Sequence, residues 1–185
     1  MTTRVLVTGI GLVTPLGLST PSTWRAVLSG QTGVKRSQHS ADIPVHATAE
    51  IARDTLPPVP PLLSPSPAFA TFALLAAREA LVDAGLLFPD GGDTPECAGY
   101  DATRAGVSVG VGMGSLADVV SAAAAVDAGR YRRVSPFLVP RLLVNSAAGV
   151  VALRHGLRGP VLSAATACAA GAHAVGDAVH AIQRG

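Results

Sequence analysis

Hydrophobic and polar positions divide the chain into short apolar runs and longer segments with helical spacing. Short runs rich in Val, Leu and Ile, flanked by Gly or Pro, predict buried strands over residues 4–10, 106–111 and 161–166. Apolar residues at helical spacing predict helices over residues 20–28, 68–84, 116–128, 140–155 and 169–183. Strands separated by helices are typical of an α/β fold with a parallel or mixed sheet. Three strands are few for this many helices, which predicts further strands beyond Gly185.

The connections between these elements carry their own signals. Thr20 followed by Pro21 predicts the N-cap and the first turn of a helix. Residues 135–140 read as an extended loop. The periodic pattern breaks down between residues 31 and 67, and prolines crowd the end of that stretch. We therefore expect a Pro-rich variable segment at about residues 35–67, which forms a surface connection or a flexible segment.

Composition narrows the classes of protein that the chain can belong to. Hydrophobic residues make up 49% of the 185 residues and charged residues 14%, which argues against disorder over most of the chain. The net charge of +2 is too small to predict a nucleic-acid partner. Every apolar run is interrupted before it reaches about 18 residues, so we expect a soluble chain with no membrane span. The N-terminus shows no pattern of a targeting presequence.

The two cysteines, Cys97 and Cys168, form no CxxC pair, so we expect neither a metal site nor a disulfide framework. Residues 159–171 combine an apolar strand, a turn of small residues, Cys168 and the start of a helix. A cysteine at a helix N-terminus faces free backbone N–H groups and the positive end of the helix dipole, which favour the thiolate. Its own backbone N–H would serve one half of an oxyanion hole. From the residues alone, a reactive nucleophile and an inert buried cysteine both stay open.

The sequence around Cys168 is one of several segments that carry a family resemblance. Residues 166–176, TACAAGAHAVG, are similar to the nucleophile motif of β-ketoacyl-[acyl carrier protein] synthases, which have a thiolase-like fold. Further similar blocks follow the order of the family at residues 4–17, 30–33, 134–140, 144–149 and 156–160. The resemblance covers nearly the whole chain outside the Pro-rich segment. It is strongest to mitochondrial and bacterial single-function enzymes.

The resemblance implies a thiolase-like layered α/β fold (αβαβα), of which the chain holds most of the N-terminal half as one incomplete domain over residues 1–185. It implies a 3-oxoacyl-[acyl carrier protein] synthase of fatty acid biosynthesis. In this family an acyl group passes to the cysteine, here Cys168, and a carbanion from decarboxylated malonyl-ACP then attacks the thioester. Two histidines and a lysine from the second half complete the family's site. Lys35, the chain's single lysine, matches none of them, so the chain alone is expected to be inactive.

The resemblance also implies a substrate pocket and a set of partners. Met113, Phe137 and Leu138 match positions that line the acyl pocket, and Phe137 and Leu138 reach it from the partner subunit of a homodimer. No metal or redox cofactor is expected, because phosphopantetheine arrives on the acyl carrier protein with the acyl and malonyl groups. The expected compartment is the cytoplasm of a bacterium, or the mitochondrial matrix or plastid of a eukaryote.

Three arginines form a basic turn after the predicted helix over residues 116–128, at positions Arg130, Arg132 and Arg133. Acyl carrier proteins are acidic, and the resemblance places their docking site in this region. From the residues alone, these arginines could equally form a solvated turn that binds no partner.

His173 lies five positions after Cys168, which is about 500° around a helix and roughly 140° from its face, so we do not expect it to be a base for the thiol. We expect His173 and His180 to pack in helix or dimer contacts, and a solvated setting for His39, His46 and His155. Two other functions stay open. One is a non-catalytic dimerisation or interaction module of the same family, and the other is a thiolase-like acyltransferase that uses coenzyme A esters.

Overall fold

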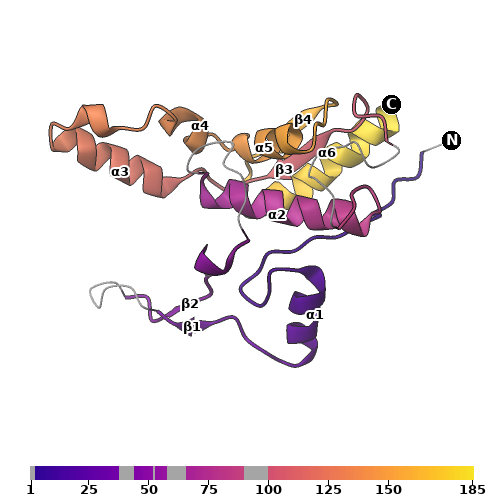
Figure 1. The fold of residues 1–185 in the computed structure, drawn as a ribbon, viewed down its shortest axis with the longest axis horizontal. Coiled ribbons are helices and arrows are strands. Elements are labelled where there is room, and N and C mark those ends of the chain that lie inside the picture. The colour runs from indigo at the N-terminus through magenta and orange to yellow at the C-terminus, as the bar shows by residue number, and fades with distance from the viewer. Residues whose placement is uncertain (1–2, 38–43, 52, 58–65, 90–99) are drawn as a thin grey trace.

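The computed structural model describes residues 3–37, 44–51, 53–57, 66–89 and 100–185. Its α-helices are α1 (Thr20–Leu28), α2 (Ala68–Asp83), α3 (Leu116–Asp127), α4 (Leu138–Leu142), α5 (Ser146–Arg154) and α6 (Ala170–Arg184). Its strands are β1 (Lys35–Arg36), β2 (Ala47–Thr48), β3 (Val107–Gly110) and β4 (Val161–Ala164) (Figure 1). Short 3-10 turns lie at η1 (Arg53–Thr55), η3 (Tyr131–Arg133) and η4 (Ala167–Ala169).

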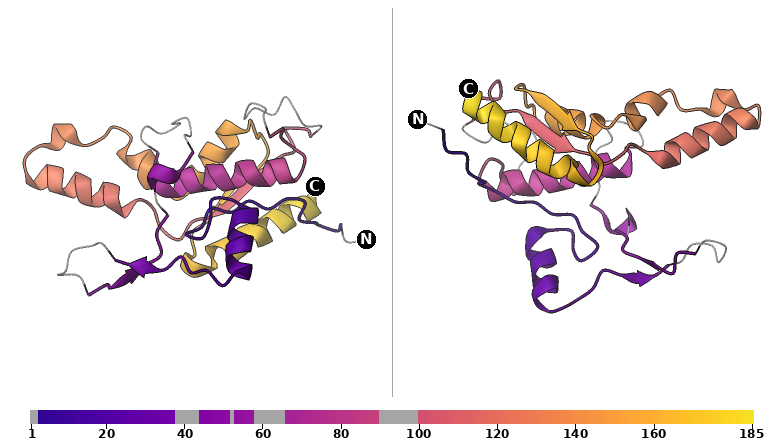
Figure 2. Two further views of the ribbon diagram at one scale, coloured as in Figure 1. Left: turned by 60° about the horizontal axis from the view of Figure 1, so that its bottom comes forward. Right: turned by 180° about the vertical axis from the view of Figure 1, so that it is seen from behind.

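The centre of the fold is a parallel pair of strands between helices. β3 and β4 pair in register from Val107 opposite Val161 to Gly110 opposite Ala164. α6 covers one face of this pair, and α5 covers the other face with α2 packed beside it (Figures 1 and 2). The buried residues at the α2–α5 contact are Ala70, Leu74, Val150 and Val151. The predicted α/β layered class is therefore confirmed, with a helix layer on each face of the strands.

Most predicted elements form close to their predicted bounds. The strands predicted over residues 106–111 and 161–166 correspond to β3 and β4, and the helices predicted over residues 20–28, 68–84 and 116–128 correspond to α1, α2 and α3. The N-cap of α1 is Ser19 and not Thr20, because the Ser19 side chain accepts a hydrogen bond from the backbone N–H of Ser22. Thr20 and Pro21 occupy the first turn instead.

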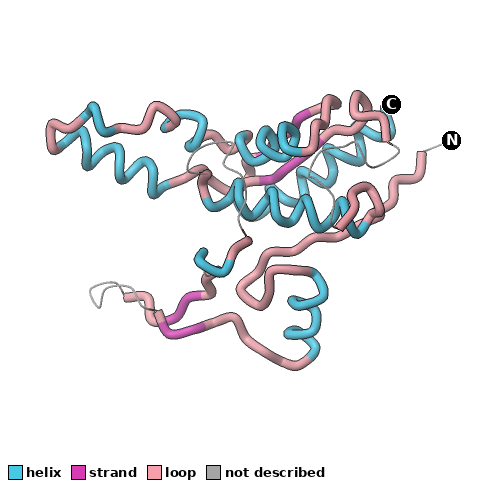
Figure 3. Tube along the Cα trace, in the orientation of Figure 1, coloured by secondary structure: helices cyan, strands magenta, loops and turns pink. Residues whose placement is uncertain are grey.

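The strand predicted over residues 4–10 does not form, and the segment runs as an extended loop along α2 (Figure 3). No described strand lies beside it, so its backbone groups find other partners. The Ile10 N–H donates to the Asp83 carboxylate at 2.9 Å, and the Leu12 N–H donates to Glu79 Oε2 at 2.8 Å. The prediction of burial is also wrong, because Val7 is 81% exposed.

The close approach of this segment to α2 depends on Gly11. A Cβ on Gly11 would lie 1.9 Å from the carbonyl oxygen of Ala76, so no larger residue fits without a backbone shift. The second carboxylate oxygen of Glu79 accepts a hydrogen bond from the Thr20 N–H at 2.7 Å. Glu79 thus ties the N-terminal segment and the start of α1 to the same point on α2.

The helix predicted over residues 140–155 is divided into α4 and α5. Leu143 adopts extended backbone angles and ends α4. The Ser146 hydroxyl donates to the Leu143 carbonyl oxygen at 2.7 Å, which turns the chain into α5. Pro140 lies in the first turn of α4, where its missing N–H removes no helical hydrogen bond. The extended loop predicted over residues 135–140 is therefore wrong from Leu138 onward.

The Pro-rich segment contains regular structure that the sequence did not predict. β1 and β2 pair in antiparallel fashion, with Lys35 opposite Thr48 and Arg36 opposite Ala47. Residues 38–43, 52 and 58–65 lie outside the described residues, and with them most of the prolines at its end. The expectation of a flexible connection is therefore untested there.

Candidate active site

Cys168 lies on a sharp turn between β4 and α6, which we call the elbow and define as residues 164–170. β4 ends at Ala164, whose carbonyl oxygen accepts a hydrogen bond from the Val111 N–H at 3.0 Å. Ala167 then has φ of 50°, the one positive φ of a non-glycine residue in the described part of the chain. An L-residue costs about 1–2 kcal/mol in this conformation, so the surrounding structure must hold it there.

The Cys168 side chain is exposed, and it has no hydrogen-bond partner among the described residues. It precedes α6, whose start no side chain caps. Cys168 therefore lies next to the N-terminal end of α6, as the sequence predicted. The alternative of an inert buried cysteine does not fit an exposed thiol. Cys97 lies outside the described residues.

The position of α6 against the strands depends on Gly110 at the end of β3. A Cβ on Gly110 would lie 2.2 Å from the carbonyl carbon of Ala170 and 2.5 Å from the backbone nitrogen of Gly171. The start of α6 therefore rests directly on the β3 backbone. Ala170 is 2% exposed, because it fills this contact. The helix that follows Cys168 is fixed by backbone packing and not by a flexible side chain.

The loop that contains Met113 lies beside the elbow. β3 and β4 run in the same direction, so the loops that follow them lie at the same edge of the pair. A Cβ on Gly112 would lie 3.8 Å from the carbonyl oxygen of Ala167. The Met113 side chain is 62% exposed. Its predicted role in an acyl pocket stays a prediction, and its neighbour Gly112 lies close to the elbow.

Phe137 and Leu138 lie on a separate part of the molecule, which we call the arm and define as residues 115–143. The arm contains α3, η3 and α4, and it reaches away from the strand pair (Figure 1). Phe137 is 45% exposed and Leu138 is half-buried. Their predicted contribution to the pocket of a partner subunit stays a prediction, because the structure contains one chain.

The arm is closed by an ion pair and carries the three predicted docking arginines. Arg141 contacts both carboxylate oxygens of Asp118, at 2.5 Å and 3.2 Å, and so joins α4 to α3. The other arginines of the arm are exposed at the turn that links α3 to α4, with no ion pair to any described residue: Arg130, Arg132 and Arg133. The structure therefore gathers the predicted docking residues on one exposed turn.

Sequence reasoning missed the partner of His173. Nδ1 of His173 lies 2.8 Å from the hydroxyl of Thr166, on the other side of Cys168 in sequence. Both His173 and His180 are exposed, so the predicted packing within the chain is wrong, and the predicted dimer packing is untested. No spacing rule for helices connects position 166 to position 173, since Thr166 precedes the helix.

His155 also departs from expectation, because it is 1% exposed and not solvated. Burial, with Arg154 and Arg78 nearby, lowers the pKa of His155 to about 4. The Tyr100 hydroxyl donates to the His155 carbonyl oxygen at 3.4 Å. His46 is exposed as expected, and His39 lies outside the described residues.

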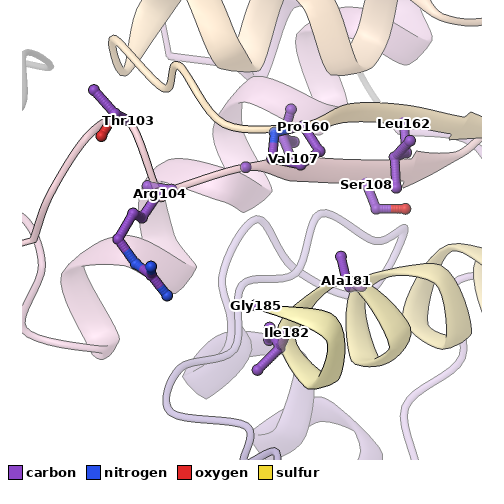
Figure 4. A pocket seen from close by; sticks show the side chains of 12 residues that line it. Thr103, Arg104, Val107, Ser108, Pro160, Leu162, Ala181, Ile182 and Gly185 are labelled. Atoms are coloured by element: carbon purple, nitrogen blue, oxygen red, sulfur yellow. The ribbon is translucent and has the colours of Figure 1, made fainter.

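A cavity of about 450 Å³ lies at the opposite end of the strands from Cys168. Its walls come from the start of β3, the start of β4 and the C-terminal part of α6 (Figure 4). None of the predicted site residues lines it. In the described residues no group of three His, Cys, Asp or Glu side chains is arranged to hold a metal ion. No described helix has both the length and the apolarity that a bilayer crossing requires.

Comparison of the sequence with known proteins identifies one family. The family model described as the β-ketoacyl synthase N-terminal domain matches residues 2–185. The mitochondrial 3-oxoacyl-[acyl-carrier-protein] synthase of Arabidopsis thaliana is 38% identical over 98% of this chain and 42% of that protein. The 3-oxoacyl-[acyl-carrier-protein] synthase 2 of Rhizobium meliloti is 36% identical over 98% of this chain and 44% of that protein.

Comparison of the fold with solved structures identifies the same family. A β-ketoacyl synthase from Burkholderia phymatum matches all of this chain and 44% of its own, with a TM-score of 0.75 and 25% identity. A type II polyketide ketosynthase in complex with its acyl carrier protein matches all of this chain and 43% of its own, with a TM-score of 0.76 and 26% identity. The chain thus spans less than half the length of the relatives that it matches.

Proposed function

The chain belongs to the β-ketoacyl synthase family, and from this premise we propose that it supplies the nucleophile of a 3-oxoacyl-[acyl carrier protein] synthase. The observation that carries the proposal is the exposed Cys168 on a strained elbow between β4 and α6. A nucleophile needs access for the substrate, and the exposed thiol on the elbow offers it. The activity is proposed for the full-length protein.

The first step is acyl transfer to Cys168. The thiolate sulfur attacks the thioester carbonyl of acyl-ACP, and the carbonyl π electrons move onto the oxygen to form a tetrahedral oxyanion. Collapse of the oxyanion breaks the bond to the phosphopantetheine sulfur, which leaves as a thiolate and takes up the proton that Cys168 released. Phosphopantetheine is part of the substrate here, so the proposal needs no resident cofactor. A backbone N–H at the elbow would stabilise the oxyanion.

The second step is condensation with malonyl-ACP. Loss of carbon dioxide leaves an electron pair on the α-carbon of the remaining acetyl-ACP. This carbanion attacks the acyl carbonyl on Cys168, a carbon–carbon bond forms, and the Cys168 thiolate is the leaving group. The product is 3-oxoacyl-ACP, and the enzyme returns to its starting state. The groups that stabilise the carbanion are expected, from the family resemblance, in the second half of the full-length protein.

The acyl carrier protein is the proposed partner. One matching ketosynthase was solved in complex with its acyl carrier protein. On this chain the exposed turn with Arg130, Arg132 and Arg133 offers three positive charges to an acidic partner. Met113 is proposed to line the acyl pocket beside Cys168. Phe137 and Leu138 are proposed to line it from the second subunit of a homodimer.

The similar proteins include mitochondrial and bacterial enzymes. We therefore propose the bacterial cytoplasm, or the mitochondrial matrix or plastid of a eukaryotic cell, as the compartment of the full-length protein.

The test is product formation by the full-length protein. It is incubated with acyl-ACP and malonyl-ACP, and 3-oxoacyl-ACP is measured by mass spectrometry. We expect product from the parent and from the matched control Cys97→Ala, and none above background from Cys168→Ala. Activity of Cys168→Ala equal to that of the parent would refute the assignment of the nucleophile. Product from acyl-CoA but not from acyl-ACP would favour the coenzyme A–dependent acyltransferase instead.

A further inference from the structure

Thr166 and His173 lie on opposite sides of Cys168 in sequence, and their side chains meet. Oγ1 of Thr166 is 2.8 Å from Nδ1 of His173. Thr166 is the residue before the strained Ala167, and His173 lies in the first turn of α6. The hydrogen bond therefore spans the part of the elbow that carries the thiol. We infer that Thr166 and His173 are positioning residues, which hold Cys168 in the orientation required for acyl transfer.

The strained backbone of Ala167, with φ of 50°, persists only if neighbouring contacts hold it. The strand side of the elbow is fixed where Ala164 accepts from the Val111 N–H. The helix side is fixed where Ala170 rests on the Gly110 backbone. Between these two points, two backbone bonds are described, from the Ala169 N–H to the Thr166 carbonyl oxygen at 3.1 Å and from the Ala170 N–H to the Ala167 carbonyl oxygen. The described side-chain hydrogen bond across the elbow is the one between Thr166 and His173, which we call the bridge.

The bridge acts on the elbow and not on the sulfur. The Thr166 hydroxyl both donates and accepts, so the bond to Nδ1 forms with either tautomer of a neutral imidazole or with the protonated ring. Nδ1 is occupied by this bond, and Cys168 has no hydrogen-bond partner among the described residues. His173 therefore has no role as a base for the thiol in this arrangement. Its effect on the reaction passes through Thr166 and the turn.

The expected size of the effect follows from the exposure of the pair. Both side chains are exposed, and a hydrogen bond between neutral groups in contact with water changes an equilibrium only several-fold. Loss of the bridge should leave the elbow folded, because the contacts of Ala164 and Ala170 remain. The thiol would then spend less time in the productive orientation. We expect acyl transfer to slow by about fivefold.

The experiment compares two reactions of Cys168 in the full-length protein, and it rests on the proposed function. Acyl transfer from acyl-ACP requires the sulfur and the oxyanion donor in a fixed geometry. Alkylation by iodoacetamide requires only an accessible thiolate. Both rates are measured by peptide mass spectrometry on Thr166→Val, His173→Leu and their double variant. The hydrogen-bonding variants are Thr166→Ser and His173→Asn, and the control is His180→Leu, an exposed histidine on the same helix.

We expect each bond-removing variant to lower acyl transfer about fivefold, with no further loss in the double variant and alkylation within about twofold of the parent. Thr166→Ser, His173→Asn and His180→Leu should match the parent. Unchanged acyl transfer in both bond-removing variants would overturn the inference. An equal fall in both rates with a lower melting temperature, or unfolding of both variants, would assign the pair to stability alone. A parent that is alkylated but never acylated at Cys168 would instead refute the proposed function, on which the inference depends.

Discussion

The elbow and the arm are built in opposite ways. At the elbow, Cys168 is held between two backbone contacts, the bond at Ala164 and the approach of Ala170 to Gly110. In the arm, neither of the two helices contains a buried residue, and one ion pair between Asp118 and Arg141 joins them. The difference indicates that the geometry of the proposed nucleophile is specified within this chain. The arm instead presents apolar and cationic side chains whose proposed roles need a partner.

A substitution at Gly110 should break the elbow most severely. A Cβ there would lie 2.2 Å from the backbone of Ala170, so either β3 or α6 must shift. We expect Gly110→Ala to lower the free energy of unfolding by about 3 kcal/mol, measured by urea denaturation of the full-length protein. The matched control is Gly176→Ala within α6, where a Cβ meets nothing within 4 Å. This control should raise stability by about 0.5–1 kcal/mol. A neutral Gly110→Ala would contradict the account of the elbow.

The helix layer formed by α2 and α5 should be sensitive to acid through His155. Burial lowers the pKa of His155 to about 4 in the folded state, whereas an unfolded histidine has a pKa of about 6.5. Between these values the unfolded state binds more protons, so stability rises with pH and is lost as pH falls below about 6.5. The loss between about pH 7 and pH 4.5 should be about 2 kcal/mol. His155→Gln should flatten this dependence in urea denaturation, whereas His180→Gln should not. If the free energy of unfolding changed equally with pH in the parent and in His155→Gln, His155 would not be the cause of the acid sensitivity.

The arm should open without disturbing the elbow when its ion pair is removed. The side chains of Asp118 and Arg141 are 16% and 14% exposed, so their pair is intermediate between exposed and fully buried pairs. We expect Asp118→Ala to cost about 1–2 kcal/mol and to speed protease cleavage within residues 115–143. Alkylation of Cys168 should not change. Asp127→Ala, at the exposed end of α3, is the control. Coupled changes in cleavage and alkylation would show that the two regions are not independent.

The smallest change in free energy is expected from substitutions at the exposed turn of the arm. Arg132 and Arg133 have no ion pair among the described residues, and each charge pair with an acidic partner is worth at most about 1 kcal/mol. The double change Arg132→Ala and Arg133→Ala should weaken acyl carrier protein binding several-fold and flatten its dependence on salt, as measured by titration calorimetry. The exposed Arg25→Ala on α1 is the control. If the affinity and its salt dependence were unchanged, we would conclude that this turn is solvated and does not bind the acyl carrier protein.

The strand, turn and helix around Cys168 could be predicted because their signals are local. An apolar run, a turn of small residues and a helical pattern lie within residues 159–183. The positive φ of Ala167 could not be predicted, because glycine is the usual signal and alanine occupies the position. The contact between Thr166 and His173 likewise depends on the angle between turn and helix, which no spacing in the sequence contains.

The wrong predictions share a dependence on tertiary partners. The apolar run at residues 4–10 has the composition of a strand, but a strand needs a neighbour, and here the backbone donates to carboxylates of α2. The apolar pattern over residues 140–155 continues through the break at Leu143, because periodicity does not report a turn made by extended backbone angles. His155 was expected in solvent because the sequence does not show that α2 and the Tyr100 segment pack around the end of α5.

The most direct test of the central claim is to locate the acyl group after the first half-reaction. The full-length protein is incubated with acyl-ACP in the absence of malonyl-ACP, quenched in acid and digested, and the peptides containing Cys168 and Cys97 are compared by mass spectrometry. We expect the mass of the acyl group on the Cys168 peptide and not on the Cys97 peptide. An acyl group on Cys97, or on neither cysteine while 3-oxoacyl-ACP still forms with malonyl-ACP, would contradict this expectation.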